Sequence, residues 1–170
     1  MTIMEAMRAR HSVRQYLNKP IDAEVIAELQ SEIKACNSAG QLHIQLVMNE
    51  PKAFDSMMAH YGQFSGVTSY IALVGKRDAE LDEKCGYYGE RIVLKAQQLG
   101  LNTCWVALTY KKVPGAFQVG DGEKLAIVIA LGYGVEAHTR FRRDLSRIIG
   151  QCELLLIHSG RSQQRGFYAG

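Results

Sequence analysis

The sequence predicts an α+β fold, a sandwich in which helices flank one central sheet of about four to five strands. The prediction rests first on about four strand-like segments, and second on the helix-like segments that separate them. The third observation is size, because 170 residues, 47% of them hydrophobic, suffice for one domain with a real core. We therefore expect residues 1–170 to form one domain, and the spacing of the strands does not dictate their order.

Composition narrows the classes of partner. Lys plus Arg is 20 and Asp plus Glu is 17, so the net charge is 20 − 17 = +3, too small to indicate a nucleic-acid-binding protein. No apolar run approaches the roughly 18 residues of a membrane span, and the N-terminus lacks the apolar region of a signal peptide. The cysteines include no C-x-x-C pair, which argues against a metal site and a disulfide framework. We expect reduced thiols in a cytoplasmic protein. The cysteines are Cys36, Cys85, Cys104 and Cys152.

Two helices are expected near the N-terminus. A short helix begins behind Thr2, which can cap it, and carries Met4 and Met7. A longer helix begins behind Asp22, a second capping residue, and should stop within residues 37–40. Its apolar face has helical spacing and consists of Val25, Ile26, Leu29 and Ile33.

Four segments have the pattern of strands. Residues 42–48 alternate apolar and other side chains, which is typical of a strand with one buried face. Residues 67–74 form a more continuous apolar run and predict a more buried strand. A short strand is expected at 103–108, and residues 124–131 give the clearest strand pattern of the chain.

Residues 78–99 form the longest helical pattern, and Gly100 is its expected stop. Apolar residues occupy much of the circumference of this helix, so it needs burial on more than one face. A short helix is expected within residues 53–62. Residues 151–170 are interpreted as a tail, with dimer contacts as one role for it.

The segment with the most chemistry is Arg-His-Ser-Val-Arg-Gln-Tyr at residues 10–16. Two arginines four residues apart gather cations and hydrogen-bond donors in one turn of chain, and a guanidinium is a planar fork of donors that suits phosphates and ring carbonyls. Ser and His add donors that can point the same way. An anionic, ring-bearing ligand would suit such a cluster. Taken alone, however, the segment favours a plainer interpretation as a basic, solvated helix terminus.

The pattern Arg-His-Ser-x-Arg-x-Tyr near an N-terminus resembles the opening motif of the FMN-dependent nitroreductase family. In that family the first Arg and the Ser contact the flavin, and the second Arg helps to hold the ribityl-phosphate. The resemblance therefore implies that Arg10 lies beside the flavin ring, that Ser12 and His11 anchor its polar edge and ribityl chain, and that Arg14 holds phosphate.

A second match is Leu-Gly-Leu-Asn-Thr-Cys-Trp at residues 99–105, which follows a long helix as it does in the family. The family's strand after this helix passes the flavin, which implies contacts from Trp105 and Val106. Asn102 stands where the family often has Gly, and because Asn tolerates the same left-handed backbone, the departure is mild. From physics alone, an amphipathic helix with a glycine cap and a buried strand is the better explanation of this stretch, and only together with the first motif does the family interpretation gain.

A third match is Gly-Tyr-Gly at residues 132–134 followed by the basic run at 140–143. The family has Gly-Tyr-Pro, then a basic pair that contacts the FMN phosphate, so the resemblance implies that Arg142 and Arg143 join Arg14 there. A solvated basic run near the chain end is the alternative. The chain has neither of the glycine-rich motifs typical of Rossmann and P-loop proteins.

The fourth match is partial. The family has Ala-Pro-Ser-x-x-Asn-x-Gln-Pro-Trp after its second helix, and here only Ser-Ala-Gly at residues 38–40 remains. The resemblance implies a flavin contact from Ser38. Residues 154–164 are either a second element on the flavin side or a tail helix, and we prefer the tail.

The resemblance covers roughly residues 3–147 and implies an enzyme that binds FMN and passes electrons from NADH or NADPH to a small acceptor such as a nitroaromatic or quinone. It also implies a mixed sheet and a homodimer with the flavin at the subunit boundary. The flavin carries the chemistry. Two alternatives remain, a flavin-binding protein without NAD(P)H turnover and an oxygen-dependent enzyme that fragments the flavin. The expected cofactor-binding residues are Arg10, His11, Ser12, Arg14, Ser38, Trp105, Val106, Arg142 and Arg143.

Overall fold

Helices and strands are interspersed along the residues that the computed structural model describes, which are 1–55 and 63–135. Residues Met1–Val135 form one unit by their contacts. A single domain over the whole chain stays a prediction. No helix in the described ranges is long and apolar enough to cross a membrane. The elements are α1 (Ile3–Ala9), α2 (Ala23–Gly40), β1 (Gln45–Val47), the 3-10 helix η1 (Pro51–Ala53), β2 (Ser69–Lys76), α4 (Leu81–Gln98), β3 (Asn102–Val106) and β4 (Glu123–Gly132).

The four strands form one sheet in the order β1-β2-β4-β3, and each neighbouring pair is antiparallel. The α+β class is therefore confirmed. The mixed pairing that the family resemblance implied is not found among these strands. In the described residues, parallel pairing is limited to two isolated bridges, Ser12 with Thr103 and Gln15 with Ser65.

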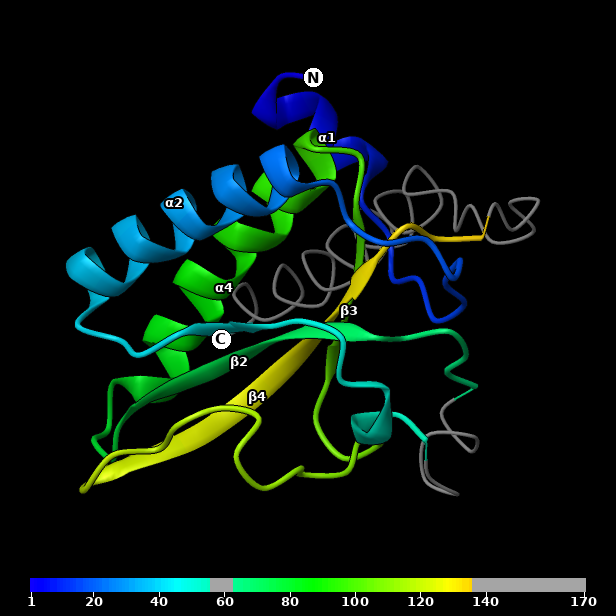
Figure 1. Ribbon diagram of the computed structural model, residues 1–170. Helices are drawn as coiled ribbons and strands as arrows, with labels where there is room; N and C mark the ends of the chain where they lie inside the picture. Colours follow the sequence, from blue (N-terminus) through cyan, green and yellow to red (C-terminus); the bar gives the residue numbers. More distant parts are fainter. Residues whose placement is uncertain (56–62, 136–170) are drawn as a thin grey trace, which may run out of the picture. The chain divides into compact units, whose positions relative to one another are not determined.

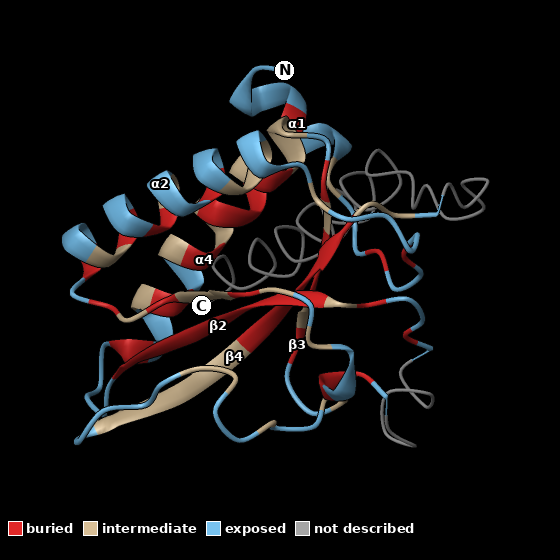
Figure 2. Ribbon diagram, in the orientation of Figure 1, coloured by how far each residue is buried: buried red, intermediate tan, exposed pale blue. Residues whose placement is uncertain are grey.

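Helices α2 and α4 lie over the same face of the sheet, as Figure 1 shows, and α1 packs against α4. Successive side chains of a strand point to opposite faces, so alternate residues of β2 and β4 meet the helices. Ile71 and Leu73 do so from β2, and Ile129 and Leu131 from β4. In Figure 2 the buried colour follows these strands and much of α4. The helical contribution to this core includes Leu29, Ile33, Ile92, Val93 and Ala96.

The long helix α4 is buried on several sides within one chain. It packs against α1, α2, β2, β3 and β4. Ile92, Val93, Leu94 and Ala96 are all buried. The need for burial on more than one face is therefore met without a second subunit.

The opposite face of the sheet is covered by irregular segments of chain. Tyr70 and Val128 point to this side and pack against aromatic side chains that precede β2. The ring centroid of Phe54 lies 5.3 Å from that of Phe64 and 6.0 Å from that of Tyr70, which is the spacing of favourable tilted and edge-on aromatic pairs. The segments that supply this cover include Val13, Tyr16, Phe54, Phe64 and Val67.

Hydrogen bonds fasten the loop between β3 and β4 to the region of β1. The Gln118 backbone N–H donates to the side-chain oxygen of Gln45 at 2.8 Å, and the Gln45 amide donates back to the Gln118 carbonyl at 2.7 Å. His43 Nδ1 lies 2.9 Å from Glu123 Oε2, and this hydrogen bond lowers the pKa of the Glu123 carboxyl. His43 therefore has a structural role.

The ends of the first helices confirm one capping prediction and correct another. Thr2 caps α1 in a capping box, because its hydroxyl accepts from the Glu5 N–H while the Glu5 side chain accepts from the Thr2 N–H. Asp22 occupies the N-cap position of α2 but makes no side-chain capping bond. Its Oδ2 instead accepts a hydrogen bond from the Tyr133 hydroxyl at 2.9 Å. The Tyr133 hydroxyl competes with the backbone N–H groups of α2 for the Asp22 carboxylate, and this competition could not be predicted from the sequence around Asp22.

Most predicted elements have somewhat different bounds in the structure, and three of them illustrate this. The expected strand at 42–48 is reduced to β1, preceded by an isolated bridge between Leu42 and Gly75. The short helix expected within 53–62 falls partly on residues outside the described ranges. In the described part, Ala53 is the last residue of η1, and residues 54 and 55 are not helical. The strand expected at 103–108 is one residue earlier at its start and ends at Val106.

Asn102 does not use the left-handed backbone that Asn tolerates. Gly100 adopts the left-handed backbone of this turn, with φ +81°, whereas Asn102 is the first residue of β3. The Asn102 side-chain oxygen accepts a hydrogen bond from the Gly134 N–H at 3.0 Å. A proline at position 134 would lack that N–H, so the two departures from the family pattern are complementary.

Candidate functional site

The segment at residues 10–16 lies along the edge of the sheet formed by β3. The Val13 N–H donates to the Thr103 carbonyl at 3.0 Å. Val13 and Tyr16 are buried and anchor the segment, and the Tyr16 hydroxyl donates to the Val13 carbonyl at 2.6 Å. Burial raises the pKa of the Tyr16 hydroxyl far above its usual range, which keeps it a protonated donor. Ser12 and Arg14 lie on either side of buried Val13 and are exposed.

A second segment secures the first. The Tyr16 N–H donates to the Ser65 carbonyl at 2.9 Å, and the Ser65 N–H donates to the Arg14 carbonyl at 3.0 Å. Gly66 has φ +71°, and a Cβ there would collide with the Tyr16 carbonyl oxygen. Only glycine therefore allows this close approach of the two backbones.

An open pocket of about 620 Å³ lies where these segments meet the end of β3. It contains three of the predicted site residues, Arg14, Trp105 and Val106. Its volume falls in the range of small-molecule sites. Sequence analysis did not identify the remaining lining residues, which are Gln63, Phe64, Ala107, Leu108 and Thr109.

Arg10 lies at the C-cap of α1 and is held by an acidic residue of α4. Its Nε is 3.5 Å from Glu90 Oε1, and its side chain is 26% exposed. Its Nη1 is buried and has no hydrogen-bond partner in the described residues. A buried guanidinium donor without an acceptor is costly, so this edge of Arg10 is suited to a ligand that can accept a hydrogen bond.

Glu90 also binds Trp105. The indole Nε1–H donates to Glu90 Oε2 at 3.2 Å. The neighbouring Gly89 gives the indole its place, because a Cβ there would collide with the Trp105 ring and with Leu73. Gly89 and Glu90 of α4 thus position Trp105, and the Glu90 carboxylate also holds Arg10.

His11 and Ser12 remain accessible beside this cluster. His11 Nδ1 lies 3.1 Å from the Ala9 carbonyl oxygen, which can only accept, so Nδ1 is the protonated nitrogen. In the neutral ring, Nε2 is then available as an acceptor. Ser12 contributes the hydroxyl that can donate.

Ser38 lies far from this cluster within one chain. It is on the last turn of α2, and the chain that follows α2 pairs with Gly75 near the C-terminal end of β2. The segment at 10–16 lies against Thr103, which aligns through β4 with Ser69 at the opposite end of β2. Arg142 and Arg143, and the segment 154–164, lie outside the described residues.

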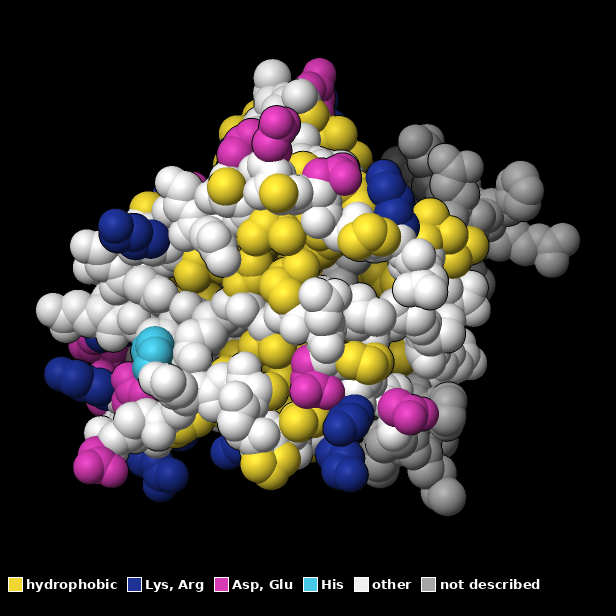
Figure 3. Space-filling model, in the orientation of Figure 1, with side chains coloured by type: hydrophobic (Ala, Val, Ile, Leu, Met, Phe, Trp, Pro, Cys, Tyr) yellow, Lys and Arg dark blue, Asp and Glu magenta, His cyan; other side chains and the backbone are white. Residues whose placement is uncertain are grey.

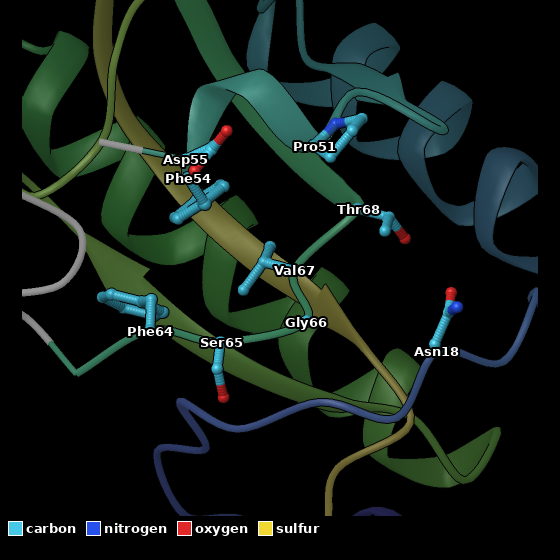
Figure 4. A pocket seen from close by; sticks show the side chains of 9 residues that line it. All are labelled: Asn18, Pro51, Phe54, Asp55, Phe64, Ser65, Gly66, Val67 and Thr68. Carbon is cyan, nitrogen blue, oxygen red and sulfur yellow. The ribbon is translucent and has the colours of Figure 1, made fainter. Parts of the chain in front are cut away.

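A second pocket of about 480 Å³ lies beside the first and shares Phe64 with it. In Figure 4 its side chains come from three segments, with Asn18 on the N-terminal segment and the others at 51–55 and 64–68. Phe54 and Val67 are buried, and Asp55 is exposed. This pocket brings together none of the predicted cofactor residues.

Glu90 is the functional candidate that sequence analysis missed. The helix containing it was predicted, but a glutamate on an amphipathic helix is ordinarily a solvated residue. The one local signal was Gly89, since a glycine inside a helix is costly unless close packing requires it.

Comparison with known proteins identifies the family. A family model described as "Putative TM nitroreductase" matches residues 2–154, and the chain therefore belongs to the nitroreductase family. No protein with curated annotation matches the chain.

Solved structures agree with this assignment at the level of fold. An FMN-dependent nitroreductase from Clostridium difficile is 15% identical with a TM-score of 0.63, and covers 82% of this chain and 92% of its own. A nitroreductase with bound FMN from Bacteroides fragilis is 19% identical with a TM-score of 0.62, over 84% and 94%. A protein from Clostridium acetobutylicum described as "Putative NADH Oxidase" is 21% identical with a TM-score of 0.60, over 86% and 96%.

Proposed function

We propose that this protein is an FMN-dependent oxidoreductase that passes electrons from NADH or NADPH to a small acceptor such as a nitroaromatic or a quinone. The observation that carries the proposal is the convergence of Arg14, Trp105 and Val106 on one pocket beside the segment at 10–16. Family membership and the FMN bound to a structural relative support the choice of cofactor.

The residues present fit FMN. The cofactor has a phosphate and a ring with hydrogen-bond acceptors along one edge. Arg14 supplies an exposed guanidinium, and Arg10 supplies a buried Nη1 that has no acceptor in the described part of the chain. The exposed side chain of Leu108 offers apolar surface in the pocket, whereas Trp105 packs on Gly89 of α4 and Val106 is buried in the core.

Each side chain then has a distinct role. Arg14 would hold the phosphate, together with Arg142 and Arg143 if the resemblance extends to them. Arg10 would donate to the ring edge, and Ser12 and His11 would bind the ribityl chain. Bound FMN supplies the acceptance and release of electrons, so no protein side chain need act as nucleophile or base.

We further propose a homodimer with the cofactor at the subunit boundary. The separation of Ser38 from the segment at 10–16 supports this, because two subunits could bring them together. Exposed apolar side chains on α1, namely Ile3, Met4 and Met7, offer surface for a partner. Figure 3 shows further apolar side chains near the middle of one face, with charged groups mainly toward its periphery. The apolar residues of α4 are buried within one chain, so this helix does not itself require a partner subunit.

A flavin titration tests the function. Purified protein should bind FMN, and anaerobic NADH or NADPH should bleach the flavin colour. A protein that binds FMN but is bleached by neither donor would be a flavin-binding protein without turnover. Failure to bind FMN would overturn the proposal. Light scattering of the FMN-loaded protein tests the dimer, and a mass near one chain would reject it.

The proposed location is the cytoplasm. The three described cysteines are free and buried: Cys36, Cys85 and Cys104. Burial raises the pKa of the Cys36 and Cys85 thiols to about 11, which makes them unreactive.

A further inference from the structure

The second pocket, of about 480 Å³, differs in charge from the pocket that contains Arg14. Asp55, an exposed residue, is the one charged residue among its described lining residues. Arg14 is likewise the one charged residue among the described residues that line the neighbouring pocket. Phe64 belongs to both linings. The two pockets therefore meet at one aromatic side chain and carry opposite charges.

Backbone hydrogen bonds hold together the three segments that form this second pocket. The Glu50 N–H donates to the Thr68 carbonyl at 2.7 Å, which joins the segment after β1 to the segment before β2. The Tyr16 N–H donates to the Ser65 carbonyl at 2.9 Å, which joins the segment before β2 to the chain that leads to Asn18. These bonds use backbone groups only, so the hydroxyls of Ser65 and Thr68 are not consumed by them. The pocket is thus formed by contacts that need no ligand.

The pocket has two polar ends and an aromatic wall. In Figure 4, Asn18 and Thr68 lie at one end with their polar groups turned toward each other, and Asp55 lies at the other end beside Phe54. Phe54 and Phe64 are buried, and their ring centroids lie 5.3 Å apart. An amide and a hydroxyl can each donate and accept hydrogen bonds, so the first end suits an uncharged polar group.

The charge at the other end selects the class of ligand. A carboxylate attracts cations and repels carboxylates and phosphates, and a cation beside a phenyl ring is attracted to the face of the ring as well. The nearest basic residues in sequence do not line the pocket. Lys52 follows Pro51, and Lys19 follows Asn18 but places its Nζ 4.0 Å from the centroid of the Tyr133 ring. The pocket therefore offers a net negative charge to a ligand.

We propose that this pocket binds an aromatic amine that carries a hydroxyl or amide group at the end away from its ammonium. The ammonium pairs with the Asp55 carboxylate, and the aromatic ring packs against Phe54 and Phe64. The far polar group meets Asn18 and Thr68. A volume of about 480 Å³ lies in the range of small-molecule sites. The site is separate from the proposed flavin pocket, and its assignment does not depend on FMN.

Three probes of similar size test the two polar ends. Tyramine carries an ammonium and a phenol hydroxyl, phenethylamine lacks the hydroxyl, and 3-(4-hydroxyphenyl)propionate has a carboxylate in place of the ammonium. Each probe is titrated against the full chain by ligand-observed NMR at constant ionic strength, because salt screens charge effects. We expect tyramine to bind about tenfold more tightly than the propionate, which is repelled, and about threefold more tightly than phenethylamine, which lacks one hydrogen bond. Failure of tyramine to bind, or equal affinity for tyramine and the propionate, would overturn the proposal.

Variants locate the site on the protein. Asp55→Asn keeps the shape of the side chain without its charge, so tyramine affinity should fall about threefold and the preference over the propionate should disappear. Asp121→Asn, at an exposed aspartate between β3 and β4, is the matched control and should leave both unchanged. Thr68→Val removes the hydroxyl at nearly constant volume, and it should weaken tyramine but not phenethylamine. Equal effects of Asp55→Asn and Asp121→Asn would mean that net charge alone attracts the amine, which overturns the site.

Competition with FMN separates this site from the proposed function. Saturating FMN should leave tyramine affinity within about twofold, because the two pockets share only Phe64 among their described lining residues. Full displacement of tyramine by FMN would place the amine in the neighbouring pocket and overturn the proposal. If the chain binds no FMN, the proposed function fails, whereas the comparison of Asp55→Asn with Asp121→Asn still decides the amine site.

Discussion

The two faces of the sheet are closed in different ways. Ile71, Leu73 and Ile129 meet two long helices on one face, whereas Tyr70 and Val128 meet irregular segments on the other. Neighbouring residues of the same strands thus enter two separate cores. The helical face is covered by regular helices, each of which buries one apolar face. We expect the packing on this face to contribute much of the free energy of unfolding.

The irregular face differs because its cover also supplies the candidate site. Val13, Tyr16 and Phe64 anchor this cover in the core, and the residues beside them line the pocket. Irregular segments placed by a rigid sheet are the usual position for binding residues. The comparison therefore predicts that substitutions in the apolar core of the helical face change stability alone, whereas those on the irregular face also change ligand binding. Trp105 and Glu90, which lie on the helical side and belong to the candidate site, are the exception.

Leu73→Ala on the helical face should have the largest effect. Leu73 is fully buried, and truncation of such a leucine costs about 4 kcal/mol of unfolding free energy through lost burial and a cavity. Denaturant unfolding measures this loss, and flavin titration should show unchanged affinity in the folded variant. Val74→Ala, one residue along on the irregular face, is the counterpart and should cost less because fewer carbons are removed. A loss below about 1 kcal/mol for Leu73→Ala would contradict the importance of the helical core.

Gly66→Ala should follow, at about 3 kcal/mol, because it combines a left-handed backbone with a collision against the Tyr16 carbonyl. The variant should also lose flavin affinity, since the segment carrying Arg14 is displaced. Gly100→Ala is the matched control: it has a similar φ of +81° but open space around the added Cβ. It should cost only the backbone strain of about 1–2 kcal/mol and leave flavin binding unchanged. Equal losses in the two variants would mean that the Tyr16 contact is unimportant.

Arg14→Ala should weaken FMN binding by about 1.5–3 kcal/mol, the scale of hydrogen bonds to a charged group. Its unfolding free energy should change little, because the side chain is exposed. Isothermal titration measures the affinity, and Arg8→Ala, an exposed arginine of α1, controls for the loss of one positive charge. Unchanged affinity in both Arg14→Ala and Arg142→Ala would place the phosphate elsewhere.

The smallest expected effect concerns Asn102 and Gly134. Asn102→Gly should cost about 1 kcal/mol of stability through the lost hydrogen bond to the Gly134 N–H. Gly134→Pro should be more harmful in the wild type than in Asn102→Gly, because a Cβ at this position comes within 2.7 Å of the Asn102 oxygen. A double-mutant cycle measured by thermal unfolding gives the coupling. Additive effects would mean that the two positions are independent.

Much of the helical face could be predicted from sequence. The faces of α2 and α4 have helical spacing, and β2 and β4 are uninterrupted apolar runs, so local pattern and burial coincide. The capping box at Thr2 is likewise local. The alternating pattern at residues 42–48 was less informative about β1. Apolar and polar side chains can alternate along a segment even where its backbone does not pair with a neighbouring strand.

For the candidate site, the sequence by itself determined the chemistry of its segments: two arginines, a serine and a histidine in seven residues, and the Trp-Val pair after a long helix. Tertiary structure decided which of these meet. It placed Arg14 beside Trp105 and Val106, and left Ser38 at the opposite end of the sheet. It alone showed that Glu90 compensates Arg10, because ion pairs between distant segments have no local periodicity. The sequence determines that Arg10 carries a positive charge. The electrostatic potential that this charge presents to a ligand depends on the carboxylate that the fold places next to it.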